Sequence, residues 1–109
     1  MSTVRLDAWQ LLEKEYPQIA QCISGSVLGL LEMAALDEKT KQLIYIAVQT
    51  AVNYPLAVKY HVPLARKAGA SRDEIVGAAS IAAAAAGPKG FVSCFPIIIA
   101  ETDDLKHDG

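Results

Sequence analysis

The segment from Leu36 to Ser71 constrains the fold most, because it combines a long uncharged stretch with a single histidine. No residue between Leu43 and Val58 carries a charge, and most of the side chains in this stretch are apolar. A helix that is apolar on nearly all sides is buried on most sides. The segment therefore predicts a central helix, followed after the turn at Asn53 by a second helix that carries His61.

Prolines, glycines and capping residues divide the rest of the chain into helices. Pro17 interrupts the first helical pattern, Asp37 is a candidate N-cap, and Ser71 opens a capping box with Glu74. No useful length of sequence shows the apolar and polar alternation of a half-buried strand. We therefore predict an all-α chain of five or six helices: Val4–Glu15, Gln18–Met33, Asp37–Val52, Pro55–Ala68, Arg72–Ala86 and Lys89–Leu105.

Glycines and prolines leave the local geometry of three of these helices open. Gly25 and Gly29 lie inside the second helix, where each costs about 1 kcal/mol relative to alanine. They predict close packing against another helix or subunit, a weakened helix, or a break near Ser24. Pro63 predicts a kink in the fourth helix, because it removes one backbone hydrogen bond. Pro96 either kinks the last helix or marks its start.

Size and composition indicate one domain that associates with copies of itself. The chain has 109 residues, so we predict a single domain over residues 1–109. Apolar residues make up 52% of the chain, which is more than a small monomer hides easily. We expect an obligate homo-oligomer whose interfaces bury the excess. The alternative is a monomer whose apolar fraction is high because it is rich in alanine.

Charge and cysteine content argue against several classes of protein. The net charge is -2 and the basic residues do not cluster, so we expect no nucleic-acid partner. The uncharged stretch is too short and too polar to span a bilayer, and no signal peptide is evident, so we expect a cytoplasmic protein without a membrane partner. Cys22 and Cys94 form no C-x-x-C motif, and we expect neither a metal nor another cofactor.

Several short motifs resemble those of a known family. They are L-D-x-K-T at Leu36–Thr40, L-I-x-I-A-V at Leu43–Val48, His61-Val62, A-x-x-A-G-A-S-x-x-E-I at Ala65–Ile75, and Gly87 after an alanine-rich helix. In this order and spacing they resemble the carboxymuconolactone decarboxylase and AhpD-like alkylhydroperoxidase family. The resemblance covers about residues 20 to 105. It implies an AhpD-like orthogonal helical bundle that assembles as a trimer or hexamer.

The resemblance also implies a site and an activity of the peroxiredoxin or alkylhydroperoxidase type, an oxidoreductase reaction. Peroxidatic members carry a C-x-x-C motif just before the histidine and a glutamate one helix earlier. In this chain the cysteine positions fall on Tyr54 and Ala57, and the glutamate position falls on Gln42. Of the catalytic groups only His61 matches. Without a thiolate at these positions, the chain lacks the nucleophile that reduces a peroxide.

The candidate site that remains consists of Gln42, Tyr54 and His61. Tyr54 and His61 lie about two turns apart, so both could line one small cavity, with the imidazole as a general base. One alternative is a lactone decarboxylase-like enzyme, from the branch of the family that also lacks the cysteine pair. Another is a non-catalytic oligomer that binds a small molecule beside Tyr54 and His61. The remaining alternative is that His61 is a core histidine of a protein whose role is structural.

Overall fold

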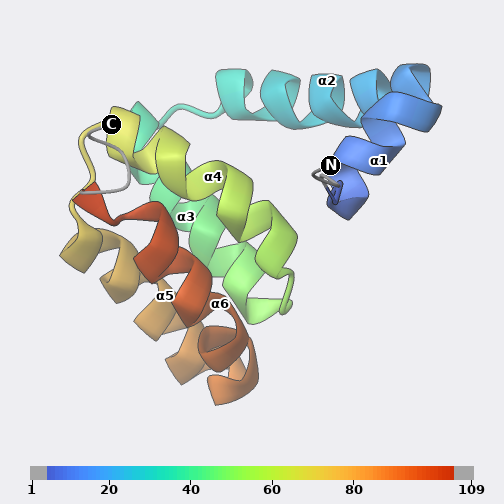
Figure 1. Cartoon of the computed structure of the whole chain (residues 1–109). Coiled ribbons are helices and arrows are strands. Elements are labelled where there is room, and N and C mark those ends of the chain that lie inside the picture. The colour runs from blue at the N-terminus through green and yellow to red at the C-terminus, as the bar shows by residue number, and fades with distance from the viewer. Residues whose placement is uncertain (1–4, 105–109) are drawn as a thin grey trace. The chain divides into compact units, whose positions relative to one another are not determined.

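The computed structural model describes residues 5–104, and within that range the protein contains six helices and no strand (Figure 1). The prediction of an all-α fold is therefore confirmed. The chain divides into two compact units, residues 1–35 and residues 36–109. The helices are α1 (Ala8–Glu15), α2 (Pro17–Met33), α3 (Glu38–Ala51), α4 (Pro55–Lys67), α5 (Arg72–Ala86) and α6 (Pro88–Glu101).

The first unit is a pair of helices, α1 and α2. Asp7 caps α1, since its carboxylate accepts a hydrogen bond from the Gln10 backbone N–H while the Gln10 side chain accepts one from the Asp7 N–H. This capping box starts α1 at Ala8, so the predicted start at Val4, which lies outside the described residues, was too early. Pro17 occupies the first turn of α2, where its missing N–H costs nothing. The helix then continues through Gly25 without the break that the sequence allowed.

The second unit packs α3 against α4, α5 and α6 (Figure 1). Its core is formed by apolar side chains from all four helices, and the most deeply buried include Ile46, Val58, Val62, Ile75 and Ile98. The buried face of α3 carries Ile46 and Thr50 at helical spacing, whereas its Ile44 and Val48 are exposed. The uncharged stretch thus forms the central helix as predicted, but this helix is buried on one side only.

The ends of the helices in the second unit follow local capping rules. Ser71 and Glu74 form the predicted capping box, and Asp37 caps α3 through the Thr40 N–H. Gly87 adopts a φ of 92° at the end of α5, a conformation that favours glycine. The helix α6 ends at Glu101, before the predicted Leu105, which lies outside the described residues. Pro63 and Pro96 both lie inside helices, so Pro96 does not start α6.

A close backbone contact joins α6 to α3. A Cβ added at Gly90 would lie 1.8 Å from the carbonyl oxygen of Thr50, so only glycine fits at this position without movement of a backbone. Gly77, in the exposed part of α5, has no atom within 4 Å of its ideal Cβ. Close packing therefore requires glycine at Gly90 but not at Gly77, although both lie inside helices.

We expect Gly90→Ala to lower the free energy of unfolding by about 2 kcal/mol or more, because the added methyl group overpacks the contact with α3. The corresponding fall in melting temperature is roughly 10 °C for a chain of this size. Gly77→Ala is the matched control and should raise stability by about 0.5–1 kcal/mol through helix propensity alone. Thermal and urea unfolding measure both changes, and equal stability of the two variants would contradict the close contact.

Candidate functional site

The candidate site begins with a hydrogen bond between α3 and α4. The Nδ1 atom of His61 lies 2.8 Å from Oε1 of Gln42. Gln42 belongs to the buried face of α3, one turn before Ile46, and is only 7% exposed. His61 is half-buried, at the edge of the α4 face that buries Val58 and Val62. The packing of α3 on α4 thus brings together two of the three residues that the sequence predicted.

The His61 ring also stacks on Tyr45. The centroids of the two rings lie 3.7 Å apart, and their planes differ by 21°. Tyr45 follows Gln42 by three positions, so both side chains face α4 from the same side of α3. Tyr45 was not among the residues predicted for the site, although its spacing of three from Gln42 is a sequence signal that places it on the same side of the helix. Together, Gln42 and Tyr45 fix both the orientation and the plane of the imidazole.

The geometry determines which ring nitrogen of His61 is available for chemistry. A carbonyl oxygen can only accept a hydrogen bond, so His61 Nδ1–H donates to Gln42 Oε1. The Nε2 atom then carries the lone pair, and it has no protein partner among residues 5–104. Burial lowers the pKa of His61 below its usual 6.5, which keeps the ring neutral at neutral pH. His61 therefore presents an oriented, neutral base.

Tyr54, the third predicted residue, lies at the start of α4. It is the N-cap residue, its side chain is 50% exposed, and its backbone N–H donates to the Gln49 carbonyl oxygen at 2.9 Å. The two turns between Tyr54 and His61 correspond to about 10 Å along a helix axis. Within the described chain, no hydrogen bond or ring contact joins Tyr54 to His61 or Gln42. A role for Tyr54 stays a prediction that needs a substrate long enough to reach it.

A cation lies in the same turn of α3 as Gln42. The Lys41 side chain is only 8% exposed, and its Nζ atom pairs with the Glu38 carboxylate at 3.1 Å. Tyr45 follows Lys41 by four positions, so the two share a side of the helix. Lys41 is thus a buried cation whose charge is already paired with Glu38.

The two cysteines differ in burial and belong to different units. Cys94 is fully buried in the core of the second unit, and burial raises the pKa of its thiol, so the protonated form predominates. Cys22 is exposed on α2, in the other unit. Over residues 5–104, no three His, Cys, Asp or Glu side chains are grouped so that they could hold a metal ion.

The length and apolar character of the described helices decide whether any of them could cross a membrane. Of the helices within residues 5–104, none has both the length and the apolar character needed to cross a bilayer.

The all-α fold and the oriented histidine between α3 and α4 agree with the protein family that the sequence matches. The model of the carboxymuconolactone decarboxylase family matches residues 18–97, and the chain belongs to this family. A crystal structure from Burkholderia xenovorans LB400, provisionally named a carboxymuconolactone decarboxylase, has the same fold. Its TM-score is 0.72 at 18% identity, and the match covers 95% of this chain and 81% of that one.

A shorter match links the chain to a protein from Paracoccus denitrificans called uncharacterized protein 4 in cox locus. The two are 43% identical over 49 residues, which is 45% of this chain and 44% of the relative. The match thus spans less than half of either protein, and its name assigns no activity.

Proposed function

We propose that the protein is a cofactor-free enzyme that transfers protons at His61 and acts on a small carboxylated lactone, in the manner of a decarboxylase. The observation that carries the proposal is the hydrogen bond from His61 Nδ1 to Gln42, because it leaves Nε2 as a neutral, oriented base. In a decarboxylation the bond to the carboxylate carbon breaks, CO2 leaves, and the electron pair stays on a conjugated carbon. That carbon then takes up a proton: Nε2 of His61 takes one from solvent and passes it to the carbon, so the imidazole returns to its neutral form and one solvent proton is consumed for each CO2 released.

The residues at the two cysteine positions of the family motif favour proton transfer over peroxide reduction. A thiol peroxidase needs a cysteine thiolate within reach of the histidine, but the two positions of the family motif hold Tyr54 and Ala57. Cys94 is buried with a raised pKa, so it does not supply the missing thiolate. The buried Lys41 is paired with Glu38, so it adds no free cation for the carboxylate of a lactone substrate.

A non-catalytic role in binding a small molecule is the second candidate. The stacked rings of Tyr45 and His61 support it, because they offer an aromatic surface with one free hydrogen-bonding nitrogen. Such a protein would bind the same carboxylated lactones but release them unchanged.

We further propose that the protein works as a homo-oligomer, with a trimer or hexamer as the form that the family resemblance implies. Support comes from large apolar side chains that are exposed in each unit. A small soluble domain seldom leaves so many uncovered unless they belong to an interface. In the second unit they include Ile44, Val48, Val52, Leu64, Ile81 and Val92. The cytoplasmic location expected from the sequence stays a prediction.

Two parallel assays test the proposed reaction. With carboxymuconolactone we expect CO2 release and formation of the decarboxylated lactone, both absent from a protein-free control. With an organic hydroperoxide and a dithiol reductant we expect no consumption above the buffer rate, because no reactive thiol lies at the site. Peroxide turnover would contradict the proposal, whereas saturable binding of the lactone without turnover would favour the second candidate.

A further inference from the structure

The turn between α3 and α4 contains a residue in an unusual backbone conformation. Asn53 has a φ of 57°, and among residues 5–104 it is the only residue other than glycine with a positive φ. A Cβ atom makes this left-handed conformation costly, and asparagine is one of the few residues that adopt it. Asn53 is exposed. Its contribution to the fold therefore lies in its backbone conformation and not in a buried side chain.

Two backbone hydrogen bonds fix the turn around Asn53. Its N–H donates to the Thr50 carbonyl oxygen at 3.0 Å. The Tyr54 N–H donates to the Gln49 carbonyl oxygen at 2.9 Å. This pair of bonds around a left-handed residue is the Schellman arrangement, which ends many helices. Pro55 then begins α4 with its φ restricted by the ring, so the three residues between α3 and α4 leave little freedom in the direction of α4.

The α6 helix packs against this turn. A Cβ added at Gly90 would lie 1.8 Å from the Thr50 carbonyl oxygen and 3.5 Å from the Asn53 Cα atom. That carbonyl oxygen is the atom that accepts the hydrogen bond from the Asn53 N–H. The turn is therefore held both by its own hydrogen bonds and by the backbone of α6.

The turn joins the two helices that form the candidate site. His61 lies six residues after Pro55, the first residue of α4, which is about 9 Å along the helix axis. Over that length, a change of about 10° in the direction of α4 displaces His61 by about 1.5 Å. The distance from His61 Nδ1 to Gln42 Oε1 is 2.8 Å, so a displacement of this size is enough to break the hydrogen bond.

We propose that Asn53 is a positioning residue: its left-handed conformation sets the direction of α4 and so brings His61 to Gln42 and Tyr45. Asn53 acts through His61 and takes no part in the reaction itself. Its effect on turnover rests on the proposed function, whereas its effect on the imidazole does not. Residues in strained conformations persist where the surrounding structure enforces them, as the two hydrogen bonds and Gly90 do here.

Substitutions at Asn53 test this role. Valine strongly disfavours a positive φ, so in Asn53→Val the turn should relax and His61 should move away from Gln42. We expect ring ¹H–¹⁵N NMR to show that the imidazole is no longer held as the Nδ1–H tautomer. We also expect kcat for the carboxylated lactone to fall by about 10²-fold, the cost of a misplacement of about 1 Å, with a smaller change in KM.

Two further variants at the same position complete the test. Glycine adopts a positive φ freely, so Asn53→Gly should restore the wild-type NMR signals of His61 and bring kcat within a few-fold of the wild type. Alanine carries a smaller penalty than valine, so Asn53→Ala is measured in the same way if Asn53→Val does not fold.

Gly69 provides the matched control for strain alone. It has a φ of 99° and lies in the same arrangement of hydrogen bonds at the end of α4. Its N–H donates to the Arg66 carbonyl oxygen at 3.0 Å, and the Ala70 N–H donates to the Ala65 carbonyl oxygen at 2.9 Å. A Cβ added at Gly69 meets no atom within 4 Å. Gly69→Val should therefore lose stability in urea unfolding, but keep the wild-type His61 signals and kcat per folded molecule.

A merely structural role for Asn53 would make the two strained variants behave alike. If Asn53→Val lost stability as Gly69→Val does but kept the wild-type His61 signals and kcat, the proposal would be overturned. Loss of the Nδ1–H tautomer in both variants would overturn it as well, because the effect would then not belong to the turn between α3 and α4.

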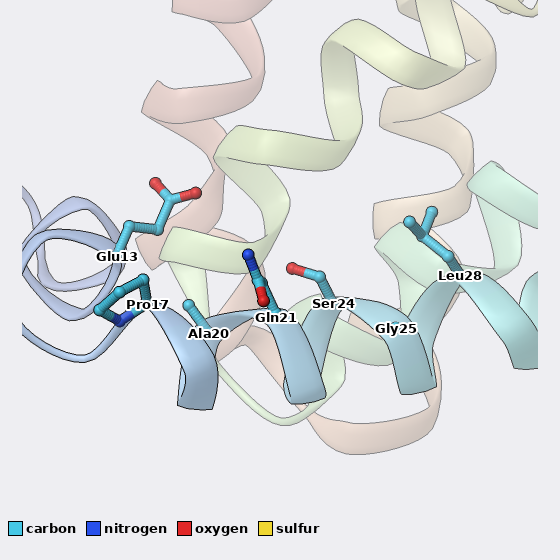
Figure 2. A pocket seen from close by; sticks show the side chains of 7 residues that line it. All are labelled: Glu13, Pro17, Ala20, Gln21, Ser24, Gly25 and Leu28. Carbon is cyan, nitrogen blue, oxygen red and sulfur yellow. The ribbon is translucent and has the colours of Figure 1, made fainter.

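A groove along α2 in the first unit is a second place where a lactone could bind. Its volume is about 440 Å³, and it is open on one side. Figure 2 shows Gln21, Ser24 and Leu28 pointing to the same side of α2. If added carboxymuconolactone shifted the NMR signals of these residues and not those of His61, the proposed function would be wrong. The role of Asn53 is tested separately, because the comparison of the His61 ring between variants needs no lactone.

Discussion

Replacing His61 by glutamine is expected to lower turnover of the carboxylated lactone by about 10²–10⁴-fold, the usual contribution of a general acid–base group. Glutamine keeps a polar side chain near Gln42 and fits the half-buried position, but it cannot take up and return a proton. Initial rates measured by CO2 release give the size of the loss. Circular dichroism and the oligomer mass show whether the fold and assembly survive.

Tyr45→Phe provides the control for that variant. Phenylalanine keeps the ring that stacks on His61, so we expect turnover within a few-fold of the wild type. Tyr45→Ala removes the stack and should lower turnover, while His61 remains the group whose titration sets the pH dependence of turnover. If His61→Gln retained full turnover, His61 would instead be a core histidine held by one hydrogen bond.

Replacing Gln42 by glutamate is expected to raise the pKa of His61 by about 1–3 pH units, because a carboxylate at 2.8 Å favours the charged imidazolium. In the wild type, burial lowers this pKa below 6.5. Glutamate is also the residue that peroxidatic relatives are expected to carry here, so the variant tests what the amide contributes. Following the His61 ring protons by NMR against pH measures both values, and the His61→Gln spectrum identifies the signals.

The lowered pKa of His61 in the wild type, and its raised pKa in Gln42→Glu, predict how the stability of each protein depends on pH. Between the lowered folded pKa of wild-type His61 and the unfolded value near 6.5, the unfolded chain binds more protons. The contribution of His61 to wild-type stability is therefore complete above pH 6.5 and is lost as the pH falls through the folded pKa. In Gln42→Glu the direction reverses: the added stability is complete below pH 6.5 and is lost as the pH rises through the raised pKa.

Urea unfolding at several pH values checks this linkage. Gln42→Met is a useful control, because it preserves the volume but supplies neither a carbonyl oxygen nor a charge. It should lower stability by about 1–3 kcal/mol, since the His61 Nδ1–H loses its partner. A His61 pKa that is the same in the wild type and in Gln42→Glu would contradict direct contact between the two residues.

Much of the fold could be predicted from helix-capping and glycine signals that act locally in the sequence. The capping box at Ser71 and Glu74, the N-cap at Asp37 and the glycine at Gly87 all act within one helical turn, so the sequence was enough to predict them. The start of α1 was missed because apolar periodicity extended past the capping box at Asp7, which sets the boundary. The close contact at Gly90 could not be predicted, because it depends on how α6 lies against α3.

Part of the candidate site could likewise be predicted from the sequence, and part of it depends on how the helices pack. Gln42 and His61 were predicted from their positions in two adjacent helices, and the structure brings them into hydrogen-bonding distance. Tyr45 was not predicted, because the family motif marks the cysteine positions, one of which is occupied by Tyr54, and not the position of Tyr45. Stacking on the histidine depends on the angle and separation of α3 and α4, which no local pattern in the sequence specifies.

The tautomer of His61 decides whether this side chain can act as the base. Long-range ¹H–¹⁵N NMR of the ring at neutral pH distinguishes a protonated nitrogen from one that carries a lone pair. We expect a neutral ring with the proton on Nδ1, bonded to Gln42, and the lone pair on Nε2. A proton on Nε2, or a ring that stays doubly protonated at neutral pH, would contradict the proposal that His61 is the base.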